Sequence, residues 1–291
     1  MLNKTPNYIK YIVSSFFLLI VFNTIFRLVF YSFFAELETA ASSEINSAFW
    51  LGLRFDIKLA AITIFPLTIL VLIVNSRFFK YSFYRRFANI YLVLAYVILT
   101  LFYLTDFGYY EYLSIRLDVA SLRFLEDFKI SSQVLLESYP VFKGLFGLLF
   151  FAFLVLKTSK FLYSKFKENK NDISKKIKAV YFITVFLLLA ISIYNSFTHY
   201  PLRWSEAFFS KNNKINQFAL NPVLNFFDSF AFRSEGVNMD EFKKYYSVIA
   251  KDLNLPKDKI SFERKVVFND TLPSQSNVVF VMLESVGVKP L

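Results

Sequence analysis

The chain has 291 residues, of which 56% are hydrophobic and 20% are aromatic, including 39 phenylalanines. A single soluble core does not need so many large apolar side chains, so the composition indicates a membrane protein. Cysteine is absent, which excludes a disulfide framework, a thiolate nucleophile and a thiolate metal site. The formal net charge is +11.

Five apolar segments are long enough to cross a bilayer, for which a helix needs roughly 17 to 25 mostly apolar residues. They lie at residues 11–34, 53–74, 87–105, 139–156 and 179–197. The fourth is the weakest, because it contains Lys143 and the helix-weakening Pro140, Gly144 and Gly147. The first is too long for a signal-peptide core and has no clear cleavage site after it. We therefore expect residues 1–198 to form a five-helix membrane domain.

The charged residues between the spans alternate in sign along the chain. Basic residues precede the first span, separate the second from the third, and follow the fourth, where eight lysines lie between residues 157 and 178. Acidic residues dominate the loops at 35–47 and 106–138. Short cytoplasmic loops are enriched in Lys and Arg, so the N-terminus is predicted inside and everything after the fifth span outside. The basic charge then faces the anionic inner leaflet, and no nucleic-acid partner is expected.

Residues 106–138 are predicted to form amphipathic helical structure on the outer surface rather than a sixth span. Apolar residues approximate one helical face there, while charged residues occupy the others. This apolar face consists of Leu117, Leu122, Leu125 and Phe128. We expect the region to seat the external part of the protein on the membrane.

The segment after the fifth span, residues 199–276, is predicted to contain interfacial helices and a linker. Within it, residues 200–232 alternate aromatic and polar side chains around a break at Asn221-Pro222, and we call this region the collar. A helix is expected from about Met239 to Leu253, followed by a polar linker at 254–276.

The last fifteen residues contain the clearest sign of a chemical site. Six uninterrupted apolar residues, Val278 to Leu283, follow a turn-forming run, which is typical of a central strand buried on both faces. Glu284 follows at the carboxyl end of this strand, the edge where ligands bind in open α/β sheets. With Ser285 and Gly287 after it, Glu284 suits a hard divalent cation as an oxygen ligand. The alternative is a carboxylate that caps the next helix.

The run Asn277-Val-Val-Phe-Val-Met-Leu-Glu-Ser285, after five spans and a collar, resembles the start of the catalytic domain in the lipoteichoic acid synthase and phosphoglycerol transferase family. That family belongs to the alkaline phosphatase and sulfatase superfamily. Three upstream segments also resemble the family in their position along the chain and in their amino-acid sequence: Gly52-Leu-Arg-Phe-Asp56, Pro201-Leu-Arg-Trp-Ser-Glu-Ala-Phe-Phe-Ser210 and Asn216-Gln-Phe-Ala-Leu-Asn-Pro222. The fold class implied is an α-helical membrane protein followed, at residues 277–291, by the first strand of a truncated external α/β domain.

The resemblance implies an enzyme of a bacterial cell membrane that transfers a phosphoglycerol-type headgroup from a phospholipid to a cell-envelope glycan or polymer. It makes Glu284 a ligand of the catalytic manganese or magnesium ion. The family's nucleophile and remaining ligands would follow Leu291, so no catalytic residue is assigned, and these 291 residues alone are expected to be inactive. His199, the single histidine, is expected at the membrane interface.

Arg54 and Lys58 are the candidate substrate-binding residues. They are four apart and share a helix face at the outer leaflet, where they would attract a lipid phosphate, while Asp56 points elsewhere. The alternative is that both snorkel from a helix end and pair with a neighbouring span. Arg27, late in the first span, is able to reach the outer interface in a similar way, and for it the structural interpretation, snorkelling with an ion pair to a neighbouring span, is favoured over ligand binding.

Other functions stay open. A phosphoethanolamine transferase would have a similar anchor and domain. A sulfatase-type ester hydrolase is less favoured, since sulfatases usually open with an Asp-Asp pair where this chain has Glu284-Ser285. From another class, the chain could be a non-catalytic membrane scaffold or a transporter subunit, although charges within the spans lie near their ends and none suggests an ion path at the midplane.

Overall fold

The structure is a computed structural model that describes residues 5–34, 41–74, 77–126, 129, 132–133, 136–137, 141–166, 174–196, 198–230, 239–253, 255–256 and 260–263. Every regular element within these ranges is helical, and none of the described residues forms a strand. The predicted strand at 278–283, Glu284 and the rest of 277–291 lie outside the described residues. The chain divides into two compact units, Met1–Arg233 and Ser234–Leu291.

The first unit contains five long helices, which are α1 (Asn7–Phe34), α2 (Ser42–Val74), α4 (Ser82–Leu113), α6 (Val141–Phe166) and α7 (Lys175–Tyr194). Each is long and apolar enough to span a membrane, which confirms a multi-pass protein with five candidate spans among the described residues. The helices are longer than the predicted spans, most clearly in α2, which begins at Ser42 instead of residue 53. Hydropathy marks only the part in the hydrocarbon, about 30 Å thick, whereas a helix of 33 residues is about 50 Å long.

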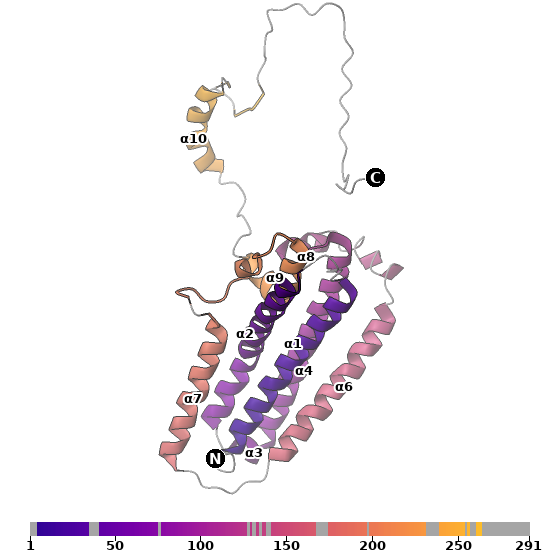
Figure 1. The fold of residues 1–291 in the computed structure, drawn as a ribbon, viewed down its shortest axis with the longest axis vertical. Helices are drawn as coiled ribbons and strands as arrows, with labels where there is room; N and C mark the ends of the chain where they lie inside the picture. Colours follow the sequence, from indigo (N-terminus) through magenta and orange to yellow (C-terminus); the bar gives the residue numbers. More distant parts are fainter. Residues whose placement is uncertain are drawn as a thin grey trace, which may run out of the picture. The chain divides into compact units, whose positions relative to one another are not determined.

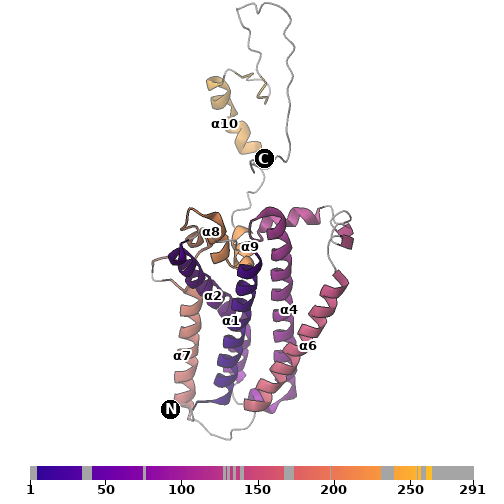
Figure 2. The ribbon, with the colours of Figure 1, turned by 45° about the vertical axis from the view of Figure 1, so that its right-hand side comes forward.

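The helices α1, α2 and α4 form the centre of this unit, with α7 against α2 on one side and α6 against α4 on the other (Figures 1 and 2). The helix α2 packs closely against α1, and small residues of α2, such as Ala60 and Ala61, are fully buried. Small side chains let two membrane helices approach closely, where packing rather than hydrophobic transfer drives association. On α6 and α7, by contrast, many large apolar side chains are exposed, as expected of helices that face lipid.

Short helices lie at both ends of the bundle. At the end where α1 begins, α3 (Arg77–Lys80) joins α2 to α4. At the opposite end lie α8 (Asn213–Ala219) and α9 (Pro222–Phe230), together with two 3₁₀ helices, η2 (Val119–Leu125) and η3 (Trp204–Ala207). We call this second end the outer end, following the predicted orientation. The collar is therefore helical and packs on the spans.

The region 106–138 differs from its predicted form. The helix α4 continues to Leu113 and ends where Ser114 adopts a left-handed conformation with φ 57°. Leu117 precedes η2 and is only 3% exposed, so it does not lie on a lipid-facing helical surface as expected. The leucines of the region 106–138 are spaced as in a helix. After the left-handed residue Ser114, however, the chain turns back toward α4, where the Leu117 N–H binds Asp106 and the Leu117 side chain is buried. Phe128 lies outside the described residues.

The second unit contains α10 (Met239–Asp252), close to the predicted helix. The residues after it fold back, since the backbone N–H of Ser261 donates a hydrogen bond to the Tyr246 hydroxyl at 3.0 Å. The ring of Phe262 packs against Phe242 and Tyr246. The first described part of the predicted linker is thus packed on α10.

The orientation of the spans can be tested with single cysteines, because the natural chain has none. Ser43 and Ser82 are both exposed and lie at opposite ends of the bundle. We expect Ser43→Cys to react with a membrane-impermeant thiol reagent in intact cells and Ser82→Cys to react only after the membrane is permeabilised. The opposite pattern would contradict the predicted orientation.

Candidate functional site

Four ionisable side chains are buried together at the outer end of the bundle. They are Arg27 of α1, Asp56 of α2, Asp106 of α4 and Arg116 of the segment after α4, and each is at most 2% exposed. Such residues are costly in a membrane protein and are found paired or facing a protein interior. Two positive and two negative groups make this cluster neutral overall.

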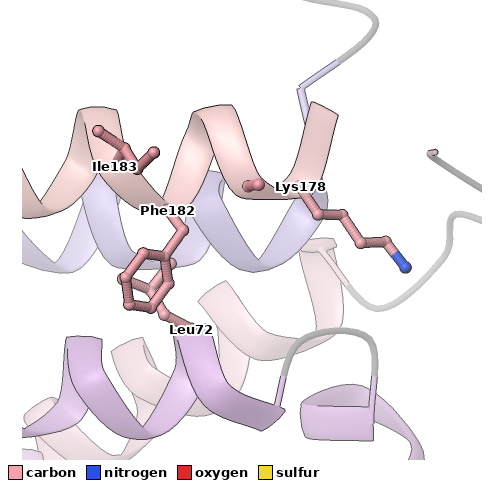
Figure 3. Close-up of a pocket in the computed structure, with 5 residues that line it drawn as sticks. Leu72, Lys178, Phe182 and Ile183 are labelled. Carbon is pink, nitrogen blue, oxygen red and sulfur yellow. The ribbon is translucent and has the colours of Figure 1, made fainter. Parts of the chain in front are cut away.

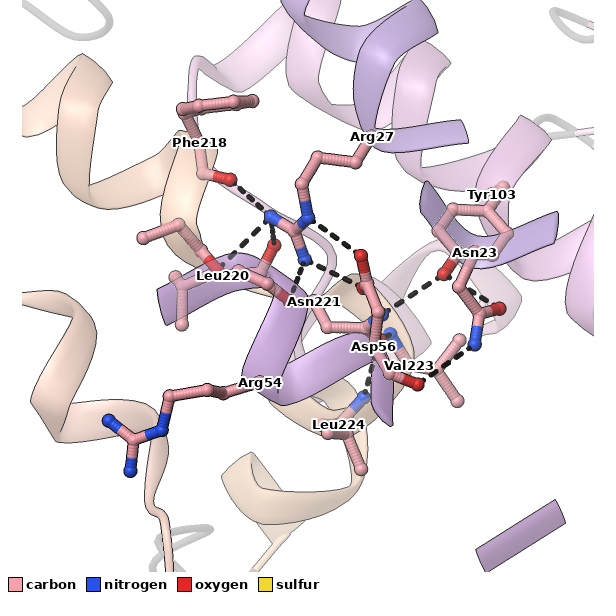
Figure 4. A network of polar contacts seen from close by, with 12 residues as sticks. Asn23, Arg27, Arg54, Asp56, Tyr103, Phe218, Leu220, Asn221, Val223 and Leu224 are labelled. Carbon is pink, nitrogen blue, oxygen red and sulfur yellow. Dashed lines mark hydrogen bonds and ion pairs between the residues drawn. The ribbon is translucent and has the colours of Figure 1, made fainter. Parts of the chain in front are cut away.

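Arg27 and Asp56 form a two-pronged ion pair between α1 and α2 (Figure 4). The Arg27 Nε–H donates to Asp56 Oδ2 at 2.8 Å, and Nη2 donates to Oδ1 at 2.7 Å. The planar guanidinium matches both oxygens of the carboxylate at once, which a lysine could not do. Arg27 thus forms an ion pair with a neighbouring span, as its structural interpretation predicts, but it does not snorkel to the outer interface, because Asp56 and the collar hold the guanidinium inside the protein. Asp56 points away from Arg54, as predicted (Figure 4).

The remaining N–H groups of Arg27 bind backbone carbonyls at the end of α8. Nη1 donates to the carbonyl oxygens of Phe218 at 2.5 Å, Ala219 at 3.2 Å and Leu220 at 3.3 Å. The last carbonyls of a helix have no partner within the helix and carry partial negative charge, so a cation is favourable there. One buried side chain of α1 therefore binds both α2 and the collar.

Gly52 provides the space that the Arg27 guanidinium occupies. Its carbonyl oxygen accepts a hydrogen bond from Arg27 Nη2 at 2.9 Å. A Cβ atom on Gly52 would overlap the guanidinium group of Arg27, so a larger residue would force the side chain to move. The glycine and the aspartate of the segment Gly52–Asp56 thus serve the same arginine.

Asn221 connects the ion pair to the start of α9. Its Nδ2 donates to Asp56 Oδ1 at 3.0 Å and to the Tyr103 hydroxyl at 3.0 Å. Its Oδ1 accepts from the backbone N–H groups of Val223 at 3.1 Å and Leu224 at 3.3 Å, which caps α9. Pro222 is the first residue of α9, where its missing N–H costs nothing. The predicted break at Asn221-Pro222 is therefore the junction of α8 and α9, held against α2.

Arg116 and Asp106 form the second buried pair. Arg116 Nη1 donates to Asp106 Oδ2 at 2.6 Å, and Asp106 Oδ1 accepts from the backbone N–H of Leu117 at 2.8 Å. Arg116 Nη2 donates to the Leu220 carbonyl at 3.1 Å, so both arginines bind the same end of α8. Burial lowers the pKa of the Arg116 guanidinium, an effect that the Asp106 carboxylate opposes. The guanidinium also lies over the Phe30 ring, 3.8 Å from its centroid.

The predicted lipid-binding residues Arg54 and Lys58 lie on one face, as expected, but both bind the chain that follows α7. Arg54 Nη2 donates to the carbonyl oxygen of Asn195 at 2.6 Å, and Lys58 Nζ donates to that of Leu202 at 2.6 Å. Arg54 Nη1 also lies 3.7 Å from Glu206. Figure 4 shows Arg54 pointing away from the buried cluster, so the structure does not bring these residues together with Arg27.

The other predicted site residues lie apart from this cluster. His199 is exposed in the segment between α7 and η3. Glu284 lies outside the described residues. Sequence reasoning missed the buried cluster, although one signal was present: opposite charges stand near the same end of two neighbouring spans, Arg27 in α1 and Asp56 in α2.

Comparisons with protein-family models, with curated proteins and with solved structures found no match to this chain. The segments that carry the family resemblance can, however, be located in the structure. Asp56 in the segment 52–56 and Asn221 in the segment 216–222 are directly bonded. In the segment 201–210, the Leu202 carbonyl accepts a hydrogen bond from Lys58, and the Glu206 carboxylate lies 3.7 Å from Arg54 of the segment 52–56. The three upstream segments therefore meet at the outer end of the bundle.

Replacing Gly52 with alanine tests whether the space beside Arg27 is required. We expect Gly52→Ala to destabilise the protein by about 1 to 3 kcal/mol, because the added methyl group overpacks the guanidinium. A lower melting temperature in detergent would measure this. Gly144→Ala is the control, since a Cβ at Gly144 of α6 meets no atom within 4 Å. Equal melting temperatures for the two variants would contradict the expectation.

Removing the charge of Asp56 tests the buried ion pair. We expect Asp56→Asn to cost about 3 to 5 kcal/mol, because it leaves the Arg27 guanidinium buried without a counter-charge. Glu206→Gln is the matched control: it removes a carboxylate from the more exposed contact with Arg54 and should cost under about 1 kcal/mol. Thermal unfolding in one detergent compares the two. A similar loss in both variants would argue against a special role for Asp56.

Proposed function

We propose that this chain is the membrane part of a metal-dependent transferase that moves a phosphoglycerol-type headgroup from a phospholipid to a cell-envelope glycan or polymer. The observation that carries the proposal is the meeting of the segments 52–56, 201–210 and 216–222, through which the chain resembles the lipoteichoic acid synthase family. These segments are far apart in sequence. Their contact supports the view that they belong to one structural feature rather than to three chance similarities.

The contacts of the collar suit an enzyme that works on lipid headgroups. Arg27 and Arg116 bind the end of α8, while Arg54 and Lys58 bind the segment that leads from α7 into the collar. These bonds fix the collar on the outer end of the spans, at the depth where lipid headgroups lie. A catalytic domain that follows such a support in the chain would be tethered to the membrane that contains its lipid substrate.

Exposed aromatic side chains of the collar support the same placement. Aromatic residues are enriched where membrane proteins meet the interface, because their rings suit the headgroup region. The exposed aromatic residues here are Tyr200, Phe208, Phe209, Phe227 and Phe230. They give the collar an apolar surface next to its buried polar contacts.

The metal in this proposal depends on Glu284 alone. Among the described residues, no group of three or more His, Asp or Glu side chains suits a metal ion. The described part of the chain thus does not fit a metal centre. A manganese or magnesium ion bound through Glu284 and further ligands would stabilise negative charge on the transferred phosphoryl group.

Two alternatives within the superfamily differ from this proposal in the product that forms. A phosphoethanolamine transferase would act on phosphatidylethanolamine, and a sulfatase-type hydrolase would pass the group to water. A transporter is less well supported, because the buried charged residues of the described chain, Arg27, Asp56, Asp106 and Arg116, gather at one end of the bundle and do not continue across the membrane.

The proposal predicts headgroup turnover that needs Glu284. We would purify the product of the complete reading frame that contains these residues, reconstitute it in liposomes with labelled phosphatidylglycerol, and measure diacylglycerol. Diacylglycerol should accumulate with Mn²⁺ and not with a chelator. Glu284→Ala should lower the rate at least about 100-fold, since losing a ligand prevents productive metal binding.

Substrate controls separate the alternatives. Phosphatidylethanolamine in place of phosphatidylglycerol should give no product, and its turnover would favour the phosphoethanolamine transferase instead. Release of free glycerol phosphate without transfer to an acceptor would favour a hydrolase. No turnover of either lipid by a folded, monodisperse protein would overturn the enzyme assignment.

A further inference from the structure

The helix α6 is held against the bundle along its inner part. Its buried side chains are Val155, Ser159 and Tyr163, which are four residues apart and therefore share one face of the helix. The Ser159 hydroxyl donates a hydrogen bond to Asn89 of α4 at 2.6 Å, and the Tyr163 hydroxyl donates to the Phe79 carbonyl at 2.7 Å. Hydrogen bonds of this kind stabilise contacts between membrane helices. They anchor the inner half of α6.

The outer part of α6, residues 141–150, is packed much less. None of the side chains described there is buried, and Phe151 is the first α6 residue that belongs to the packed core. Phe142 and Phe146 are each 79% exposed, and a Cβ atom at Gly144 would meet no atom within 4 Å. Figure 2 shows α6 diverging from α4 toward its outer end. The outer part of α6 is therefore surrounded by lipid instead of protein.

The other peripheral helix, α7, is held at both ends and gives a comparison within the molecule. At its inner end, Phe182 lies beside Leu72 of α2 (Figure 3). At its outer end, Arg54 of α2 donates to the Asn195 carbonyl, and the Asn195 side chain donates to the Arg54 carbonyl, both at 2.6 Å. Both peripheral helices face lipid, so a loose outer end is a particular property of α6.

An aromatic surface on α1 and α4 continues outward beyond the point where α6 leaves it. The Phe151 ring of α6 stacks on Phe22 of α1 and also contacts Tyr96 of α4, with ring centroids 5.7 and 6.3 Å away. Phe26 and Phe107 follow on the same faces of α1 and α4, since they lie 4 and 11 residues farther along. Their ring centroids are 6.1 Å apart, and both side chains are only partly buried. We call these four residues of α1 and α4 the aromatic strip.

The outer part of α6 has a face that suits the outer half of this strip. A helical period of 3.6 residues places Leu148, Gly144 and Val141 on the same face as Phe151 and Val155. This face carries no charged group that would oppose contact with aromatic rings. The surface that packs in the inner half of α6 thus continues outward, where it has no partner among the described residues.

We propose that α6 is a hinged helix, whose outer part moves between the position in Figure 2 and a closed position on the aromatic strip. The anchors of its inner half form the pivot, and a segment with few buried contacts moves at low cost. Closure would bury Phe26 and Phe107. Phe107 also packs on Phe30, whose ring lies under the buried Arg116 guanidinium, so α6 controls lateral access from the bilayer to this side of the buried cluster. The inference needs no headgroup transfer and goes beyond the proposed function.

Distances between two spin labels test this movement, and the natural chain contains no cysteine that would have to be removed first. The full chain would be labelled at Leu104→Cys of α4 and Phe142→Cys of α6, and measured by double electron–electron resonance in phosphatidylcholine nanodiscs. We expect a longer and a shorter distance, for the open and closed positions. An inner pair, Phe87→Cys with Phe161→Cys, should give one narrow distance. A single narrow distance for the outer pair would overturn the proposal.

Further variants show whether the shorter distance comes from contact with the aromatic strip. Gly144→Trp should remove it by blocking the contact face, whereas Phe146→Trp, on the opposite face, should retain it. Phe107→Leu should lower its population about threefold, because one aromatic contact is lost. In each variant the inner pair reports whether α6 is still anchored. An unchanged shorter distance in an anchored Gly144→Trp variant would contradict closure on the strip. Lipid turnover is not measured, so this test and that of the proposed function fail independently.

Discussion

The buried pair of Arg27 and Asp56 is the interaction on which the outer end of this protein depends. A charged side chain inside a membrane protein loses the hydration that it has in water, and only a partner with good geometry offsets that loss. Here the carboxylate accepts two hydrogen bonds from the guanidinium and a third from Asn221. The guanidinium in turn binds the end of α8. Neither charge can be moved without leaving the other unsatisfied, so the positions of α1, α2 and the collar are linked.

The Arg27–Asp56 pair explains several local features of the sequence around it. Gly52 is needed because the guanidinium fills the place of a side chain. Asn221 caps α9 with one atom and binds Asp56 with another, so the break between α8 and α9 has a fixed position. The second pair, Arg116 with Asp106, binds the same carbonyl of Leu220 and brings the end of α4 into the same cluster. Because each pair joins one positive to one negative group, the cluster stays neutral overall, which limits its cost in a low-dielectric environment.

The spans were predictable from sequence because a hydrophobic segment of sufficient length has few other stable places than a bilayer. All five appear at the predicted positions among the described residues. The helix ends were less predictable, since α2 and α4 continue beyond the hydrocarbon in residues that hydropathy does not mark. The role of Arg27 was not predictable from its own segment. An arginine at this position in α1 can extend outward to the interface or inward to the protein. The inward conformation is stabilised by Asp56 of α2 and by carbonyls at the end of α8, about 190 residues later in the sequence.

The spacing of Arg54 and Lys58 in the sequence predicts which face of α2 they share, but not what they bind there. The spacing correctly places both on one face of α2, but their chemistry depends on what covers that face. Arg54 is occupied by the Asn195 carbonyl and lies near Glu206, so it holds the connection between α7 and the collar. Lys58 makes one such bond and stands at the end of an apolar hollow that opens between α2 and α7. Both basic residues therefore hold the chain that follows α7 against the outer part of α2, a role that depends on carbonyls about 140 residues later in the sequence.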